Sequence, residues 1–184
     1  GAFITLKNGN IMFAYSLYGG EGDDDGAAAD IYVGVYQGSV PELLDVRCLK
    51  NTTAETILIS IMTVNNETGT IMPVQEIAKM KGKAVFHTDA VQAFGKLDLR
   101  NTGADLISVS AHKIHGPKGM GALYVKKGIN LPAYLVGGGQ ERHMRSGTEN
   151  VPGIVGFDAA CRIAIPNLES RVKQMAEVRD YLKR

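Results

Sequence analysis

The chain has 184 residues, with 20 Lys and Arg against 19 Asp and Glu, so its formal net charge is +1. This balance gives no electrostatic reason to expect a nucleic-acid partner. Hydrophobic residues make up 45% and charged residues 21%, as in a globular domain rather than a disordered chain. No apolar run reaches about 18 residues and no signal-peptide pattern is present, so we expect no membrane span. Cys48 and Cys161 lack metal-type spacing and indicate a reducing compartment, with the cytoplasm as the expected location.

The N-terminal segment predicts a hairpin followed by a linker. Residues 3–6 and 11–15 are strand-like and flank an Asn-Gly-Asn turn, whose residue types tolerate positive φ. Residues 19–29 are rich in Gly, Asp and Ala and offer nothing apolar to bury. The acidic run at 23–25 lacks the alternating ligand spacing of a calcium loop, which favours a solvated linker.

From residue 30 onward, strand-like and helix-like segments alternate, an order that is typical of an α/β fold. Residues 56–62 form an almost continuous apolar run, as in a strand buried on both faces of a parallel sheet. The last helix has an apolar stripe at spacings of three and four residues. The stripe consists of Leu168, Val172, Met175, Val178 and Leu182. Strands are expected at 31–35, 56–62, 84–87, 106–110 and 120–125, and helices at 39–49, at 73–81 and in two segments near the C-terminus.

We therefore predict a mostly parallel sheet with flanking helices, preceded by a hairpin-like segment. The chain divides into residues 1–29, whose role is unknown, an α/β domain over 30–165, and a C-terminal helix over 166–184.

Polar residues follow three of the predicted strands, where open α/β sheets bind ligands. Asn-Asn-Glu-Thr-Gly-Thr occupies 65–70, His-Thr-Asp-Ala-Val-Gln occupies 87–92, and Ser-Ala-His-Lys occupies 110–113. Each motif alone is weak, because an Asp after a strand is often a helix cap and a single His is usually a bonded structural residue. Three such loops in strand order are more informative than any one of them.

The groups in these loops have complementary chemistry. A lysine in a partly desolvated cleft forms an imine with a carbonyl. A carboxylate pairs with a protonated pyridine nitrogen, while hydroxyls and backbone N–H groups hold a phosphate. Together these requirements describe a site for pyridoxal 5′-phosphate (PLP).

Residues 56–157 resemble the large domain of the cysteine desulfurase family, which are PLP enzymes of fold type I. The resemblance is carried by SIMTVNNETGTIMPV, FHTDAVQAFGKL, SVSAHKIHGPKGMGALYV and GGGQERHMRSGTENVPGIVGF, which occur in the family's order. It implies that residues 30–165 are a partial PLP-binding large domain of a PLP-dependent transferase, or aminotransferase class V, fold.

The resemblance implies roles around the cofactor ring. Lys113 is similar to the lysine that carries PLP as an imine and later transfers a proton at the substrate Cα. Asp89 resembles the aspartate that pairs with the pyridinium nitrogen. Gln92 and Asn66 resemble residues that hydrogen-bond the ring's phenolic oxygen.

The same resemblance implies contacts to the phosphate. Ser110 and His112 are similar to phosphate ligands. Thr148 resembles a threonine that reaches the phosphate in the neighbouring subunit's site, which implies a homodimer. No metal ligand is implied.

The implied activity is removal of sulfur from L-cysteine, which yields L-alanine and an enzyme-bound persulfide and supplies sulfur for iron–sulfur clusters. A sulfur-acceptor protein would be a further partner. Selenocysteine lyase shares these motifs and is the alternative within the enzyme class. A non-catalytic fragment that binds only PLP or a partner chain is the alternative outside it.

The sulfur nucleophile of the resembled family lies on a loop in a C-terminal small domain. Cys48 and Cys161 instead fall on predicted helices, and Cys161 is expected to be a buried, small apolar residue. We therefore expect neither cysteine to be the nucleophile and the chain alone to be inactive in desulfuration.

Overall fold

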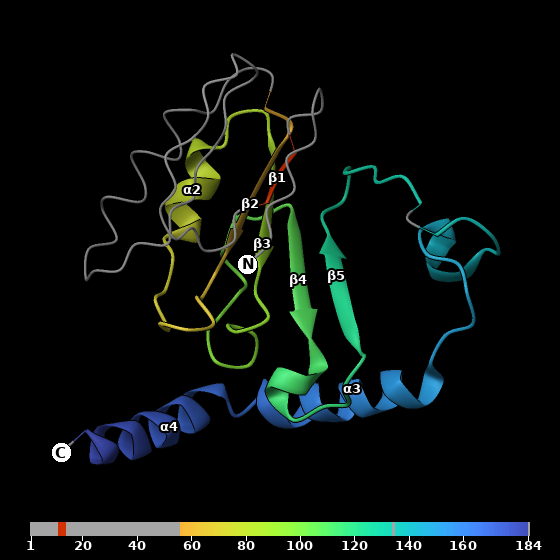
Figure 1. Cartoon of the computed structure of the whole chain (residues 1–184). Coiled ribbons are helices and arrows are strands. Elements are labelled where there is room, and N and C mark those ends of the chain that lie inside the picture. The colour runs from red at the N-terminus through yellow and green to blue at the C-terminus, as the bar shows by residue number, and fades with distance from the viewer. Residues whose placement is uncertain (1–10, 14–55, 134, 184) are drawn as a thin grey trace.

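A five-stranded sheet organises the computed structural model, which describes residues 11–13, 56–133 and 135–183 (Figure 1). The strands are β1 (Ile11–Phe13), β2 (Leu58–Met62), β3 (Val85–Asp89), β4 (Leu106–Ser110) and β5 (Gly121–Val125), and they lie in this order across the sheet. The first four strands are parallel, and β5 pairs with β4 in the antiparallel sense. The predicted mostly parallel α/β sheet is thus confirmed.

Several predictions from the N-terminal sequence lie outside the described residues. They are the first hairpin strand, the linker, the strand at 31–35, the helix at 39–49 and Cys48. Residues 11–13, which were expected in a hairpin strand, pair in parallel with residues 58–60 of β2. The division of the chain at residues 29 and 165 stays a prediction.

The described helices fall where the sequence predicts them. They are α2 (Val74–Met80), α3 (Val151–Ala164) and α4 (Leu168–Leu182), with short 3-10 helices η1 (Ala111–Ile114) and η2 (Gln140–His143). Pro73 precedes α2 directly, as expected from its fixed φ at a helix start. At the start of α3 the Asn150 side chain accepts a hydrogen bond from the backbone N–H of Gly153 at 3.1 Å, which satisfies one of the helix's open donors.

The two faces of the sheet differ in chemistry. On one face Ile59, Ile61 and Phe86 are at most 2% exposed, and they pack with Val74 and Ile77 of α2. Successive strand side chains alternate between faces. Ser60, His87 and Ser108 therefore project from the opposite face, whereas Thr88 lies on the apolar face, where its hydroxyl is 2.7 Å from that of Thr63.

A second apolar cluster fixes the turn after β4. Ile114 of η1 packs with Ala160 and Ala164 of α3, and Phe94 contacts Phe157 edge-to-face with ring centroids 6.1 Å apart. Figure 1 shows α3 running across the end of the sheet beside this turn. The turn that follows β4 is thus held between the β3 turn and α3.

The last helix is poorly covered by the rest of the described chain. Four of the five apolar residues predicted to form a stripe on α4 are exposed, from 36% for Val172 to 78% for Leu182, and Leu168 is half-buried. No side chain of α4 is fully buried within the described chain. The helix itself is confirmed, whereas its stripe has no covering element among the described residues. None of the helices described is long and apolar enough to cross a bilayer.

Candidate active site

The carboxyl ends of β2, β3 and β4 meet at one edge of the sheet because these strands are parallel and adjacent. The turn over residues 66–68, the turn over 91–96 and η1 follow these three strands directly or within a few residues. The structure therefore brings the three polar loops predicted from the sequence to the same edge, as open α/β sheets require for ligand binding.

Asp89 ends β3 with a half-buried side chain. Its carboxylate accepts a hydrogen bond from the backbone N–H of Val91 at 2.9 Å. Its backbone carbonyl accepts one from the N–H of Thr63 at 2.8 Å, which ties the β3 end to the β2 end. Ala90 N–H donates to the Ser108 carbonyl at 2.9 Å. The carboxylate is thus held at a defined place between two neighbouring strands.

The Ser-Ala-His-Lys motif forms the end of β4 and the tight turn η1. Ser110 Oγ lies 2.6 Å from His112 Nδ1. The Gly116 N–H donates to the Ala111 carbonyl at 2.9 Å and closes the turn. Lys113 is exposed, and its ammonium group makes no hydrogen bond or ion pair within the described residues. This lysine is therefore accessible to a ligand at the strand ends.

Two predicted site residues are less closely joined to the rest. Asn66 is exposed in the turn after β2, whereas its neighbour Asn65 is buried and accepts the N–H groups of Glu67 and Thr68 at 2.9 Å each. Thr148 is exposed in the segment between η2 and α3. No hydrogen bond within the described chain joins Asn66 or Thr148 to the other predicted site residues.

A histidine that the sequence left as a structural residue links three strands. His87 Nδ1 lies 2.6 Å from Ser60 Oγ, and its Nε2 lies 2.8 Å from Ser108 Oγ. Burial lowers the pKa of His87, and the neighbouring Asp89 carboxylate partly opposes that shift. A neutral imidazole satisfies both serines by donating to one and accepting from the other. His87 thus holds β2, β3 and β4 together two residues before Asp89, on the same face of the sheet.

Two charged residues make several hydrogen bonds in the structure although the sequence motifs did not indicate them. Asp105 is almost fully buried and accepts hydrogen bonds from Lys81 at 2.5 Å, from Lys126 at 3.1 Å and from the Phe86 N–H at 3.0 Å. Lys96 donates to two backbone carbonyls near the strand ends. The only sequence signal for Asp105 is its position directly before a predicted strand. No sequence signal pointed to Lys96.

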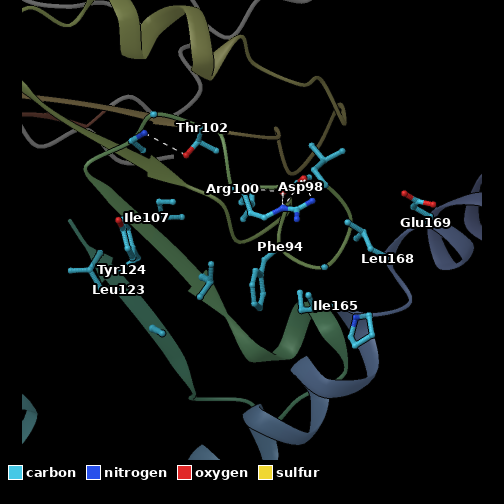
Figure 2. A pocket seen from close by; sticks show the side chains of 18 of the residues that line it. Phe94, Asp98, Arg100, Thr102, Ile107, Leu123, Tyr124, Ile165, Leu168 and Glu169 are labelled. Atoms are coloured by element: carbon cyan, nitrogen blue, oxygen red, sulfur yellow. Dashed lines mark hydrogen bonds and ion pairs between the residues drawn. The ribbon is translucent and has the colours of Figure 1, made fainter. Parts of the chain in front are cut away.

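A large groove opens beside the sheet. It has a volume of about 1120 Å³ between the β4–β5 face and the connection of α3 to α4. Figure 2 shows Ile107 and Tyr124 on the sheet side and Ile165 and Leu168 on the helix side. None of the seven predicted site residues lines it. The groove therefore does not contain the predicted site residues, although Phe94 and Gly95 of the turn after β3 line part of it.

The chain belongs to the aminotransferase class-V family, whose sequence model matches residues 36–183. The cysteine desulfurase of Sinorhizobium fredii (strain NBRC 101917 / NGR234) is 52% identical to it over 131 residues, which cover 69% of this chain and 34% of that protein. The cysteine desulfurase of Nostoc sp. is 47% identical over 135 residues, covering 71% of this chain and 34% of that protein. The chain thus spans about a third of the length of the curated relatives it matches.

Solved structures similar to this chain include relatives of the same kind. A NifS-like protein matches with a TM-score of 0.70 and 43% identity, over 78% of this chain and 40% of that chain. SspA in complex with cysteine matches with a TM-score of 0.60 and 38% identity, over 67% of this chain and 36% of that chain. The family consists of PLP-dependent enzymes, and the relatives carry the name cysteine desulfurase, so selenocysteine lyase is not favoured. The resemblance stated from the sequence motifs is confirmed.

Proposed function

We propose that this chain supplies the PLP-binding part of a cysteine desulfurase that acts on L-cysteine. One observation carries the proposal. The accessible ammonium group of Lys113 and the carboxylate of Asp89 follow neighbouring parallel strands at one edge of the sheet. The relatives named cysteine desulfurase, and a solved relative that binds cysteine, support the choice of reaction and substrate.

The residues at the strand ends fit PLP by their chemistry. The aldehyde of PLP requires a primary amine, its pyridine nitrogen a carboxylate, and its phosphate hydrogen-bond donors. Lys113 supplies the amine and Asp89 the carboxylate. The hydrogen-bonded pair of Ser110 and His112, next to Lys113 along the chain, supplies donors for the phosphate.

Bound PLP supplies an electron sink that stabilises negative charge developing at the substrate Cα. In the proposed reaction the Asp89 carboxylate holds a proton on the ring nitrogen. Gln92 and Asn66 hydrogen-bond the phenolic oxygen and orient the ring. The Lys113 amine would act as a general base that moves the proton at the substrate Cα.

Thr148 is proposed to act in a second copy of the chain. Its exposed side chain is not joined to the strand-end residues by any hydrogen bond within the described part, as expected of a residue that reaches the phosphate in a neighbouring subunit. The homodimer is proposed because Thr148 resembles a threonine that reaches the phosphate of a neighbouring subunit. A sulfur-acceptor protein as a further partner and the cytoplasm as the location are proposed from the same family resemblance.

Transfer of sulfur requires a thiol that Cys161 does not provide. Cys161 lies in α3, partly buried against the cluster around Ile114, and burial raises the pKa of its thiol, with Asp158 adding to the shift. A raised pKa lowers the thiolate fraction at neutral pH, and a helix position lacks the reach of a loop. We propose that the persulfide does not form on Cys161. The other cysteine of the sequence, Cys48, lies outside the described residues and is likewise not expected to be the nucleophile.

Covalent labelling tests the proposal. The protein is incubated with PLP and reduced with borohydride, and the modified peptides are mapped by mass spectrometry. Label concentrated on Lys113 is expected, with Lys118 as the internal control because it lies five residues further along the same loop. Label on Lys118 without label on Lys113, or no label on either lysine, contradicts the proposed site.

A further inference from the structure

The turn after β3 and the turn after β4 approach each other closely. Gly95 has a φ of +71°, and a Cβ at this position would lie 2.6 Å from Ile114 Cγ2. Glycine is required there both for the left-handed backbone and for the space. The segment that carries Gln92 therefore packs directly on η1, which carries Lys113.

Lys96 connects the same two segments through its ammonium group. Its Nζ donates to the backbone carbonyl of Gln92 at 3.2 Å and to that of Lys113 at 3.4 Å. Both acceptors belong to residues placed in the proposed cofactor site. The Lys96 side chain thus joins the turn after β3 to the turn after β4, directly after Gly95, where the two turns pack together.

The electrostatic surroundings of Lys96 do not favour its charge. Burial lowers the pKa of Lys96, and the like charges of Lys113 and Arg171 lower it further. No carboxylate within the described chain forms an ion pair with it. The two backbone hydrogen bonds are therefore the only polar contacts of this ammonium group within the described chain.

We propose that Lys96 is a positioning residue of the cofactor site, which holds the Gln92 turn and the Lys113 turn at a fixed separation through its two backbone hydrogen bonds. The inference rests on the proposed function, because it assigns Lys96 a role toward Lys113 as the PLP-binding lysine. Its consequence is that removal of the ammonium group changes the reactivity of Lys113 without weakening the fold.

The test uses three variants of the protein. Lys96→Met keeps the length and the apolar stem but removes the donors and the charge. Lys96→Arg keeps both the donors and the charge and serves as the conservative rescue. Lys79→Met is the matched control, since Lys79 is exposed on α2 and makes no hydrogen bond or ion pair in the described chain.

Each variant is measured in three ways: the rate of PLP labelling at Lys113 relative to Lys118, hydrogen–deuterium exchange of residues 91–97 and 111–116, and the thermal midpoint. For Lys96→Met we expect labelling at Lys113 to slow by about tenfold, because small displacements of a reacting group have large kinetic effects. We expect faster exchange in both turns and an unchanged or higher thermal midpoint. Lys96→Arg should restore labelling, and Lys79→Met should match the wild type.

The outcomes separate this inference from the proposed function. Wild-type labelling rates and exchange in Lys96→Met overturn the positioning role while leaving the PLP site intact. A lowered thermal midpoint with a uniform loss of labelling at both lysines shows a structural role and also overturns it. If the wild type is not labelled at Lys113, the proposed function fails, and with it the role of Lys96 toward the cofactor. The exchange data then decide only whether Lys96 joins the two turns.

Discussion

Two regions of the described chain differ sharply in how far their apolar side chains are covered. In the first, β2, β3 and α2 enclose Ile59, Ile61 and Phe86 at 2% exposure or less. In the second, α4 has no buried side chain within the described residues, and Leu182 is 78% exposed. The strand ends that carry the candidate chemistry therefore rest on a well-covered apolar core, to which α4 contributes little.

The largest expected change in the free energy of unfolding comes from removing a core side chain. Phe86→Ala should lower the free energy of unfolding by about 3–5 kcal/mol, because Phe86 is 0% exposed and truncation leaves a cavity. Val178→Ala on α4 is the matched control, with 57% exposure and an expected change within about 0.5 kcal/mol. Urea unfolding followed by circular dichroism measures both. Equal losses in the two variants would show that α4 is packed as firmly as the sheet.

A second effect concerns the buried carboxylate beside the core. Asp105→Asn should cost roughly 3 kcal/mol, since it removes the charge that Lys81 and Lys126 contact. Burial raises the pKa of Asp105, but the hydrogen bonds from Lys81, the Phe86 N–H and Lys126 outweigh burial and lower it below its ordinary value of 3.8.

The sign of the pH dependence follows from that lowered pKa. The stabilisation by Asp105 is fully present above pH 4 or so and is lost as the pH falls through the lower, folded-state pKa. The difference in unfolding free energy between wild type and Asp105→Asn should therefore shrink as the pH drops below about 4. Urea midpoints measured between pH 3 and pH 7, as a rough range around that value, test this. A difference that stays constant over the range would show that the carboxylate charge is not what stabilises the fold.

The smallest effect acts on ligand binding and leaves the core intact. Asp89→Asn should weaken PLP binding by about 10- to 100-fold, since a hydrogen bond between charged groups contributes about 1.5–3 kcal/mol. It should also shift the visible absorbance of the bound cofactor, because the ring nitrogen loses its anionic partner. A spectrophotometric titration measures both quantities.

Asp98→Asn is the matched control for that titration, because Asp98 pairs with the exposed Arg100 and lies outside the strand-end loops. Its affinity for PLP should equal that of the wild type. An Asp89→Asn variant with the affinity and the spectrum of the control would remove Asp89 from the site.

The periodicity of the chain was sufficient to predict each described strand after β1 and each described α-helix. The continuous apolar run at 56–62 predicted a strand with both faces covered, and residues 59–62 of β2 are buried. The order of the loops placed Asp89 and Lys113 at strand ends, since consecutive parallel strands present their carboxyl ends at one edge. Strands, helices and the loops that follow them depend on the spacing of apolar and polar residues along the chain, and this spacing can be read directly from the sequence.

Only the tertiary structure decided which groups meet across strands. The bonds from His87 to Ser60 and Ser108 join residues 27 and 21 positions apart, and the bond from Lys96 to the Lys113 carbonyl joins residues 17 apart. Periodicity likewise could not predict that most of the α4 stripe is exposed. It predicts an apolar face on the helix but does not identify a neighbour that covers it. Local spacing fixes which side of an element a residue occupies. Register and packing between elements fix what that residue touches, and these depend on interactions between segments far apart in the chain.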